Sequence, residues 1–441
     1  MGTATASWQI EGSVATRGRC IWDDFAERPG AIVDGTVGEP ACDHLNRIDE
    51  DLDLLTWLGV DAYRFSFSWP RIQPGGTGPA SPAGVAVYDR IIDGLLERGI
   101  SPVATLYHWD LPSDLPGWTS RETAERFADY TALVADRFAD RVDMWATLNE
   151  PWVSAYLGYA IGIHAPGVVD PGGSLAAAYH LMLAHGLGMQ RLRAAGARRP
   201  GIVLNLIPAV AEDPGAEAAR RHVDGLHNRF FLDLLAGRGI PADVRQTCAS
   251  LTDWSFVRDD DLPIISAPID WIGENYYTIN RISSTPTGAS GAGQDLAAYP
   301  ACPPAFMAPR EPRTAMGWEV IESGLIDVLH MAAQALPGVP IHVTENGAAF
   351  EDAVSTDGRV HDPQRVDYYR RHIDAALEAR AQGVPVEGYF AWSLLDNIEW
   401  AEGMTKRFGI VRVEPGTMQR IPKDSALWLR ERLAARRSAA G

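Results

Sequence analysis

Residues 142–150 read VDMWATLNE, an apolar run that ends in the polar pair Asn149-Glu150. An amphipathic stretch, Ser174–Ala195, follows this run, and a second apolar run, Gly201–Ile207, comes after it. Strand, helix and strand in this order are typical of two parallel strands joined by a helical crossover. The pattern therefore predicts one βαβ unit in this part of the chain.

The same alternation continues toward both ends of the chain. Further strand candidates are Val60–Phe67, Ser101–Tyr107, Ile269–Tyr277, Val339–Thr344 and Val386–Ser393. Helical patterns lie between the candidates, at Val85–Arg98, Arg121–Ala139, Ala216–Ala236, Ser323–Leu336 and Pro363–Arg380. With one more strand at the extreme N-terminus, the set closes a (β/α)8 TIM barrel. No linker divides the pattern, so we expect a single domain over residues 1–441.

The segment Ser283–Pro312 is rich in Gly, Ser, Ala and Pro. It directly follows a predicted strand, which favours a long loop of the barrel over a tether between domains. Catalytic groups of a parallel barrel gather at the carboxyl ends of its strands. We therefore expect this loop to lie near the functional site.

Composition and charge exclude several classes of function. The formal net charge is −18, from 57 acidic and 39 basic side chains, which disfavours contact with nucleic acid or an anionic membrane. The four cysteines lie far apart without a C-x-x-C pair, so neither a zinc site nor a disulfide scaffold is expected. The first residues do not resemble a secretory leader, and no apolar run reaches the length of a membrane span. A cytoplasmic protein is the resulting expectation.

The sequence lacks the common motifs of zinc proteases, serine hydrolases and nucleotide-binding proteins. It contains no H-E-x-x-H pair, no G-x-S-x-G elbow and no G-x-x-x-x-G-K-[ST] loop. His342 and Glu345 lie three positions apart on a predicted strand, so their side chains point to opposite faces and cannot share a metal ion. We expect no metal and no organic cofactor.

Two acidic residues stand at predicted strand ends, Glu150 after the fourth strand and Glu345 at the seventh. In an eight-stranded barrel these ends face each other across a narrow opening, so the two carboxyls can converge on one bond. One such residue alone could be a helix cap or an ion-pair partner. Two carboxyls in different environments are what acetal hydrolysis needs, one protonated for the leaving group and one ionised for the oxocarbenium ion.

Six ordered motifs of the chain resemble glycoside hydrolase family 1, the β-glucosidase family of retaining (β/α)8 enzymes. The motifs are YRFSFSWPRI, YHWDLP, TLNEP, NYYT, TENG and AWSLLDNIEWAEGMTKRFG, and the resemblance runs from Gly2 to Ser425. A four-letter motif can arise by chance, whereas six in the same order cannot.

The resemblance implies a role for each matched residue. Glu150 in TLNEP would be the general acid/base, Glu345 in TENG the nucleophile, and Tyr277 in NYYT a hydrogen-bond donor to that nucleophile. The residues that would bind the substrate are Gln9, His108, Trp109, Asn149, Asn205, Trp318, Trp392, Glu399 and Trp400. Among them, Trp392 would be the stacking floor under the sugar and Trp318 a platform for the leaving group. For Asn205 and Trp318, polar capping and core packing remain the alternative roles.

The resemblance further implies a retaining, exo-acting β-glucosidase that takes small-molecule β-glucosides and cello-oligosaccharides. A β-galactosidase, a β-fucosidase or a transglycosylating enzyme remains an alternative, since these sugars share most contacts. A carbohydrate-binding protein that has lost its activity is the third alternative. The oligomeric state is open, and a homo-oligomer is compatible with the sequence.

The N-terminus departs from the family pattern. Members usually have a strand and an aromatic residue ahead of GTATAS, whereas this chain begins with Met1 at that point. We therefore expect the first barrel strand to be cut short, or the natural start to lie upstream. In either case the strand that carries Gln9 would be weakly anchored.

Overall fold

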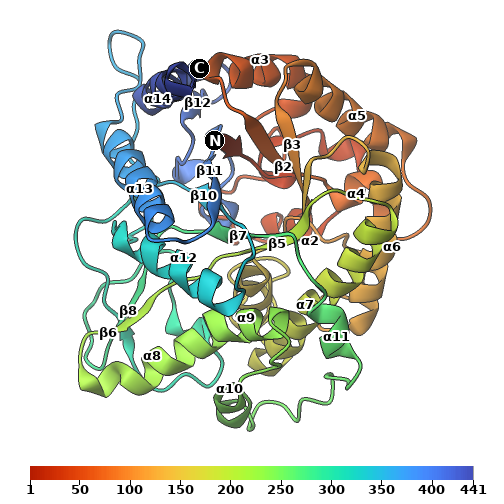
Figure 1. Ribbon diagram of the computed structural model, residues 1–441, viewed down its shortest axis with the longest axis vertical. Coiled ribbons are helices and arrows are strands. Elements are labelled where there is room, and N and C mark those ends of the chain that lie inside the picture. Colours follow the sequence, from red (N-terminus) through yellow and green to blue (C-terminus); the bar gives the residue numbers. More distant parts are fainter. Residues whose placement is uncertain (441) are drawn as a thin grey trace.

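The computed structural model describes residues 1–440 and contains a closed barrel of parallel strands (Figure 1). Around the barrel the order is β1-β2-β3-β4-β5-β7-β10-β11, and β11 pairs with β1. The barrel strands are β1 Gly2–Ala4, β2 Ala62–Ser66, β3 Ser101–Tyr107, β4 Met144–Asn149, β5 Pro200–Leu204, β7 Trp271–Asn275, β10 Ile341–Asn346 and β11 Val386–Trp392. This arrangement confirms the predicted (β/α)8 barrel.

The barrel strands have buried apolar side chains on both faces. On β5, Val203 packs inside the barrel with Met144 and Trp271, whereas Ile202 and Leu204 belong to the layer that includes the surrounding helices. Burial of both faces is typical of parallel strands, and each Ile or Leu buried in this way contributes about 2 kcal/mol. It also explains why the strand candidates read as continuous apolar runs rather than as strict alternations.

Helices surround the barrel on its outer side (Figure 1). Those that follow the strands are α3 Ile48–Leu58, α5 Pro82–Glu97, α6 Arg121–Phe138, α7 Pro171–Ala194, α8 Glu217–Asp224, α9 Phe230–Leu235, α12 Ser323–Ala335, α13 Pro363–Ala381 and α14 Asp424–Ala440. The helix predicted over Ala216–Ala236 is divided, because a π-helical turn, η6 Gly225–Arg229, separates α8 from α9. No helix among residues 1–440 combines the length and the apolar character needed to cross a membrane.

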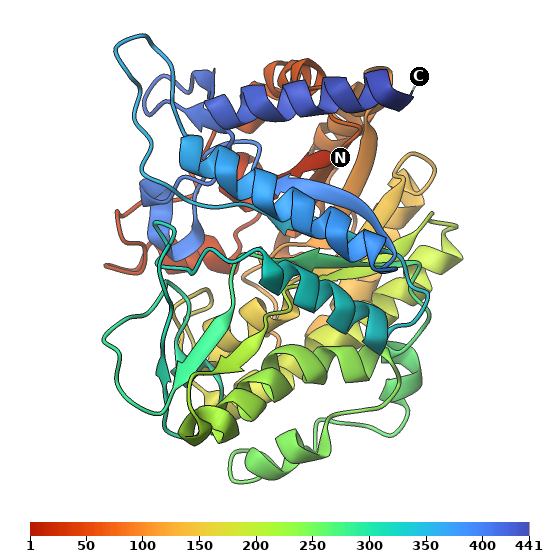
Figure 2. The same ribbon diagram turned by 60° about the vertical axis from the view of Figure 1, so that its left-hand side comes forward.

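Helix α3 was not among the predicted helices. Its first turn contains Asp49, Glu50 and Asp51, and acidic side chains favour a helix N-terminus through the helix dipole. Gly59 ends the helix in the left-handed conformation, with φ 73°. Helix α3 contacts the C-terminal helix α14, which in turn lies against α13 (Figure 2), so the first and last of the helices around the barrel complete the ring.

The first strand is short, but its expected weak anchoring is wrong. Strand β1 has three residues, and it pairs in parallel with β11 on one side and β2 on the other. The amino group of Met1 also lies 2.7 Å from Asp61 Oδ2. Gln9 lies on the short helix α1, Ser7–Ile10, rather than on the strand, and its side chain is fully buried.

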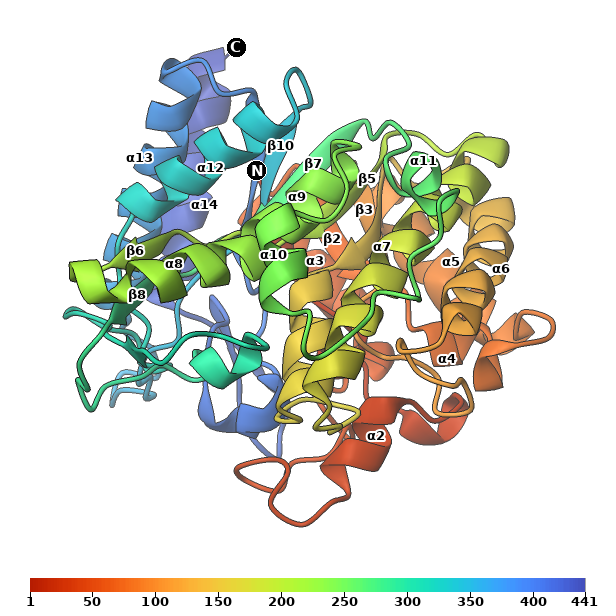
Figure 3. The ribbon, with the colours of Figure 1, turned by 90° about the horizontal axis from the view of Figure 1, so that it is seen from below.

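A small sheet lies outside the barrel, with β8 Asn280–Ser283 between β6 Ala209–Ala211 and β9 Phe306–Met307. In Figure 3, β6 and β8 lie at one edge of the molecule beside α8. The long loop that follows β8 contributes Ala292, Gly293, Gln294 and Tyr299 to the lining of the main cavity. The expected position of the Ser283–Pro312 segment near the functional site is therefore confirmed.

Candidate active site

A cavity of about 330 Å³ lies at the carboxyl ends of the barrel strands. Most of the residues predicted to bind or transform the substrate line it: His108, Trp109, Glu150, Asn205, Tyr277, Trp318, Glu345, Trp392, Glu399 and Trp400. The other two, Gln9 and Asn149, are buried behind the lining. The structure thus brings together residues that lie far apart in the sequence.

Glu150 follows β4 directly and has a strained backbone. Its φ is 46°, in the left-handed region that a side chain other than glycine rarely adopts, and its N–H donates to Val203 O at 3.0 Å. Its carboxyl accepts a hydrogen bond of 2.6 Å from Asn275 Nδ2. Backbone strain that persists at a cavity is typical of functional positions.

Glu345 lies near the end of β10, where the pairing with both neighbouring strands is irregular. Such bulges turn a side chain away from the regular strand direction. Its carboxylate accepts two short hydrogen bonds, from Arg64 Nη1 at 2.5 Å and from the Tyr277 hydroxyl at 2.6 Å. The contact expected between Tyr277 and Glu345 is therefore present.

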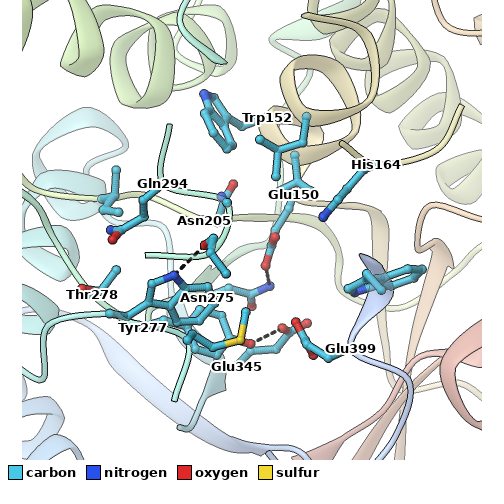
Figure 4. A pocket seen from close by; sticks show the side chains of 18 of the residues that line it. Glu150, Trp152, His164, Asn205, Asn275, Tyr277, Thr278, Gln294, Glu345 and Glu399 are labelled. Atoms are coloured by element: carbon cyan, nitrogen blue, oxygen red, sulfur yellow. Dashed lines mark hydrogen bonds between the residues drawn. The ribbon is translucent and has the colours of Figure 1, made fainter. Parts of the chain in front are cut away.

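Asn275 connects the surroundings of the two glutamates. Its Nδ2 donates both to Glu150 and to Asn149 Oδ1, and its Oδ1 accepts from Thr344 Oγ1 at 2.7 Å. Thr344 directly precedes Glu345 on β10. This bond from Thr344 fixes which end of the amide faces Glu150. Figure 4 shows Asn275 between Glu150 and Glu345.

The two carboxyls differ in their electrostatic surroundings. Burial, together with the charge of Glu345, raises the pKa of Glu150 to about 8, so it is mostly protonated at neutral pH. Burial raises the pKa of Glu345 above its usual value as well, but the charge of the Arg64 guanidinium and the hydrogen bond from the Tyr277 hydroxyl oppose this rise, and Glu150 has no such cation bound to it. Of the pair, Glu345 is therefore the carboxyl that carries the charge. One proton donor and one carboxylate are what the sequence analysis required.

Buried polar side chains at the base of the cavity form two hydrogen-bonded groups, one around Asn149 and one around Gln9. Asn149 Oδ1 accepts from Arg64 Nη2 at 2.6 Å, and Asn149 Nδ2 lies 3.2 Å from His108 Nε2. Burial, and then the charge of Arg64, lower the pKa of His108 well below its usual range, so the ring is neutral. Gln9 Nε2 donates to Ile398 O at 2.8 Å. Asn149 and Gln9 thus lie directly behind the lining, and their predicted contact with the sugar stays a prediction.

Aromatic rings form one wall of the cavity. The Trp109 and Trp400 ring centroids lie 4.3 Å apart, and Trp400 stacks on Trp8 at 5.7 Å with an interplanar angle of 9°. Beside them, burial and then the charge of Glu345 raise the pKa of Glu399 well above its usual range. A neutral carboxyl can both donate and accept hydrogen bonds, as contact with sugar hydroxyls requires.

The outer half of the cavity contains both Asn205 and Trp318. Trp318 donates from Nε1 to Ala292 O at 2.8 Å and remains half-buried at the lining. Sequence reasoning missed several residues here, among them Trp152, His227 and Gln294. Trp152 lies at the start of the helical segment just after Glu150, His227 lies on the π-helical turn η6, and Gln294 lies in the loop after β8, so the strand-end pattern gives no signal for the last two.

Arg64 and Asn275 are the most important residues that sequence reasoning did not assign to the site. Arg64 is the single charged residue in the strand run AYRFS, and a charge buried in a barrel needs a partner. That isolated charge was the available signal. Asn275 belongs to the NYYT motif, but the motif does not show which carboxyl its amide contacts.

A metal centre has no candidate here, because no group of three His, Cys, Asp or Glu side chains within residues 1–440 is placed to hold an ion. The cavity offers instead a paired acid and carboxylate, aromatic faces and neutral hydrogen-bonding groups.

Comparison with known proteins agrees with this geometry. The model of glycosyl hydrolase family 1 matches residues 1–437. β-Glucosidase A of Thermotoga maritima is 42% identical over 97% of this chain and 95% of its own length. The bifunctional β-D-glucosidase/β-D-fucosidase of Bifidobacterium breve is 43% identical over 98% of this chain and 96% of its own length.

Solved structures give the same result. The crystal structure of the psychrophilic β-glucosidase of Micrococcus antarcticus superposes with a TM-score of 0.94 at 43% identity, covering 98% of this chain and 96% of that one. The Thermotoga maritima β-glucosidase in complex with noeuromycin superposes with a TM-score of 0.91 at 41% identity, over 98% and 97% of the two chains. The chain therefore belongs to glycosyl hydrolase family 1.

Proposed function

We propose that the protein is a retaining, exo-acting β-glucosidase, with Glu345 as nucleophile and Glu150 as general acid/base. The main support is the contrast between the two carboxyls in one cavity. Glu345 accepts hydrogen bonds from Arg64 and Tyr277, whereas Glu150, whose pKa is raised to about 8, accepts one from the neutral amide of Asn275.

The first half-reaction uses both groups at once. The Glu345 carboxylate attacks the anomeric carbon, the bond to the leaving oxygen breaks, and the proton of Glu150 passes to that oxygen. The product is a glycosyl ester on Glu345 and a free alcohol. Ester formation removes the negative charge that helped to raise the pKa of Glu150.

The second half-reaction follows from that loss of charge. Glu150 is now a carboxylate and takes a proton from water, the water oxygen attacks the anomeric carbon, and the ester bond to Glu345 breaks. The sugar leaves with its original configuration, Glu345 is again ionised and Glu150 is again protonated. One pair of carboxyls thus serves both steps without a cofactor.

Glucosides are the proposed substrates, including cello-oligosaccharides, because the curated relatives reported above are named β-glucosidases. The Bifidobacterium relative is named for β-fucosidase activity as well, so β-fucosides are the second candidate. We further propose that residues 1–441 act as one catalytic domain, which the family match over 1–437 supports. A cytoplasmic location fits the four free cysteines, three of which are buried.

Covalent labelling tests the proposal directly. Incubation with a 2-deoxy-2-fluoro β-glucoside should add one sugar to the peptide that contains Glu345, and Glu345→Gln should remove both the label and the turnover of 4-nitrophenyl β-glucoside. Labelling of another residue, or cleavage of β-galactosides well ahead of β-glucosides and β-fucosides, would contradict it. Exposed Glu97→Gln is the matched control and should be labelled like the unchanged protein.

A further inference from the structure

A chain of hydrogen bonds runs along the outer half of the cavity. Gln294 Nε2 lies 3.1 Å from Asn280 Oδ1, and Asn280 Nδ2 lies 2.7 Å from the Tyr299 hydroxyl. The Tyr299 hydroxyl lies 2.8 Å from His227 Nδ1, and His227 Nε2 lies 2.7 Å from Asn205 O. The chain thus connects the loop after β8 to the residue that follows β5.

The direction of every bond in this chain is determined by its last acceptor. A backbone carbonyl can only accept, so His227 carries its proton on Nε2 and its Nδ1 must accept. The Tyr299 hydroxyl therefore donates to His227 and accepts from Asn280 Nδ2. Asn280 Oδ1 then accepts from Gln294. Burial lowers the pKa of His227 to about 3, which keeps the ring neutral and the direction constant.

Asn205 ends the relay with its backbone, and its side chain remains free for a ligand. The residue lines the cavity and is half-buried, and within residues 1–440 no hydrogen bond involves its side-chain amide. Figure 4 shows Asn205 at the cavity with Trp152, Gln294 and Glu150. The hydrogen bond from His227 restrains the Asn205 carbonyl and so the place from which the side-chain amide reaches the cavity.

An aromatic face accompanies this amide. The Trp152 ring stacks on His227 at 4.1 Å with an interplanar angle of 21°, and it lines the cavity. Tyr299 packs against the same indole at 5.3 Å. A flat apolar surface beside a few oriented polar groups is the combination that binds a small polyhydroxylated ligand.

We propose that the relay of Gln294, Asn280, Tyr299 and His227 holds Asn205 in the position from which its amide binds a hydroxyl of the leaving group, so that cleavage of a disaccharide depends on the relay more than cleavage of an aryl β-glucoside does. The inference rests on the proposed function, since it concerns the leaving group of that same reaction. Tyr299 and His227 are positioning residues, because they act through Asn205.

The experiment compares two substrates in the full-length protein. For each variant, kcat/KM is measured with 4-nitrophenyl β-glucoside and with whichever β-linked glucose disaccharide the unchanged protein cleaves best. The readout is the ratio of the two values, disaccharide to aryl glucoside. General loss of stability or of catalytic geometry lowers both values together, whereas loss of a contact to a sugar leaving group lowers the ratio.

Tyr299→Phe removes the hydroxyl in the middle of the relay, and His227→Phe keeps a ring under Trp152 but removes both nitrogens. Each should lower the ratio roughly three- to tenfold, as the loss of one uncharged hydrogen bond does. His227→Gln keeps a donor toward Asn205 O and should recover part of the ratio. Tyr156→Phe is the matched control, since the Tyr156 hydroxyl is buried without a partner in the described chain beside the same Trp152.

The outcomes separate the two proposals. The relay proposal is overturned if Tyr299→Phe and His227→Phe leave the ratio unchanged, or if Tyr156→Phe lowers the ratio by as much as they do. Either result leaves the β-glucosidase proposal intact. If the unchanged protein cleaves the aryl glucoside but no disaccharide, the relay proposal is also overturned and the β-glucosidase proposal remains. Cleavage of neither substrate overturns the proposed function itself.

Discussion

Arg64 Nη1 donates a hydrogen bond to Glu345 Oε1 over 2.5 Å, and both side chains are almost completely buried. A carboxylate at this depth is strongly destabilised unless a cation or hydrogen-bond donors face it. The same guanidinium also donates to Asn149. Arg64 therefore stabilises the charge of the proposed nucleophile and the position of its neighbour at the same time.

Arg64→Met should lower kcat/KM for 4-nitrophenyl β-glucoside by about a hundredfold or more, because a preorganised charge is lost from a desolvated site. The Arg64 guanidinium lowers the pKa of Glu345, so its removal raises that pKa. The acidic limb of the kcat/KM profile should therefore move to higher pH. An acidic limb at its original position would contradict this role, and Arg19→Met, at an exposed ion pair, is the control.

The raised pKa of Glu150 should be visible as a basic limb near pH 8 in the kcat/KM profile, because activity is lost when the acid deprotonates. In Glu150→Gln this limb should disappear. The measurement uses 4-nitrophenyl β-glucoside, whose departure is still assisted by a proton. A basic limb that persists in Glu150→Gln would assign it to another group. Exposed Glu97→Gln is expected to leave the profile unchanged.

Glu274→Leu should stabilise the protein at pH 7.5 but much less at pH 4. Glu274 is 0% exposed on β7, neither carboxyl oxygen has a partner in the described residues, and burial raises its pKa well above the usual range. Above about pH 4.3 the unfolded chain ionises this group while the folded protein keeps it protonated, so folding stability falls as pH rises.

Denaturant midpoints at the two pH values measure the effect. A gain in midpoint at pH 7.5 that shrinks at pH 4 is the expected pattern. Equal changes at both values would mean that Glu274 contributes through packing rather than through its proton. Glu97→Leu, an exposed substitution of the same kind on α5, should show no pH-dependent gain.

Lys423→Met should destabilise the protein strongly. Lys423 Nζ lies 2.5 Å from Asp352 Oδ2 and 2.8 Å from Asp396 Oδ1, with all three side chains buried. Removal of one member leaves unpaired buried charge, which costs about 3–5 kcal/mol. Thermal unfolding should show a clearly lower Tm. The double variant Lys423→Met/Asp396→Asn should recover part of the loss, and simple additivity of the two changes would contradict the coupling.

Much of this protein could be predicted from the sequence. The strand candidate Ser101–Tyr107 coincides with β3, and Glu150, Glu345 and Tyr277, which the motifs indicate, all line the cavity. The predictions were wrong where the local sequence pattern for a strand or helix is weak. The segment with Gln9 was expected on a poorly anchored strand, yet three residues of β1 with two neighbouring strands are enough to hold it.

The sequence by itself determined the barrel and the identity of the two carboxyls. The alternation of strands and helices predicts the barrel and short motifs predict the glutamates, and each of these patterns depends on residues that are close together in the chain. Only the tertiary structure supplies a physical cause for the different surroundings of the two carboxyls. Arg64 and Tyr277, from other parts of the chain, lower the pKa of Glu345, whereas burial and the charge of Glu345 raise the pKa of Glu150. A pKa depends on burial and on charges and donors within a few ångströms, and such neighbours are brought together only when the barrel closes.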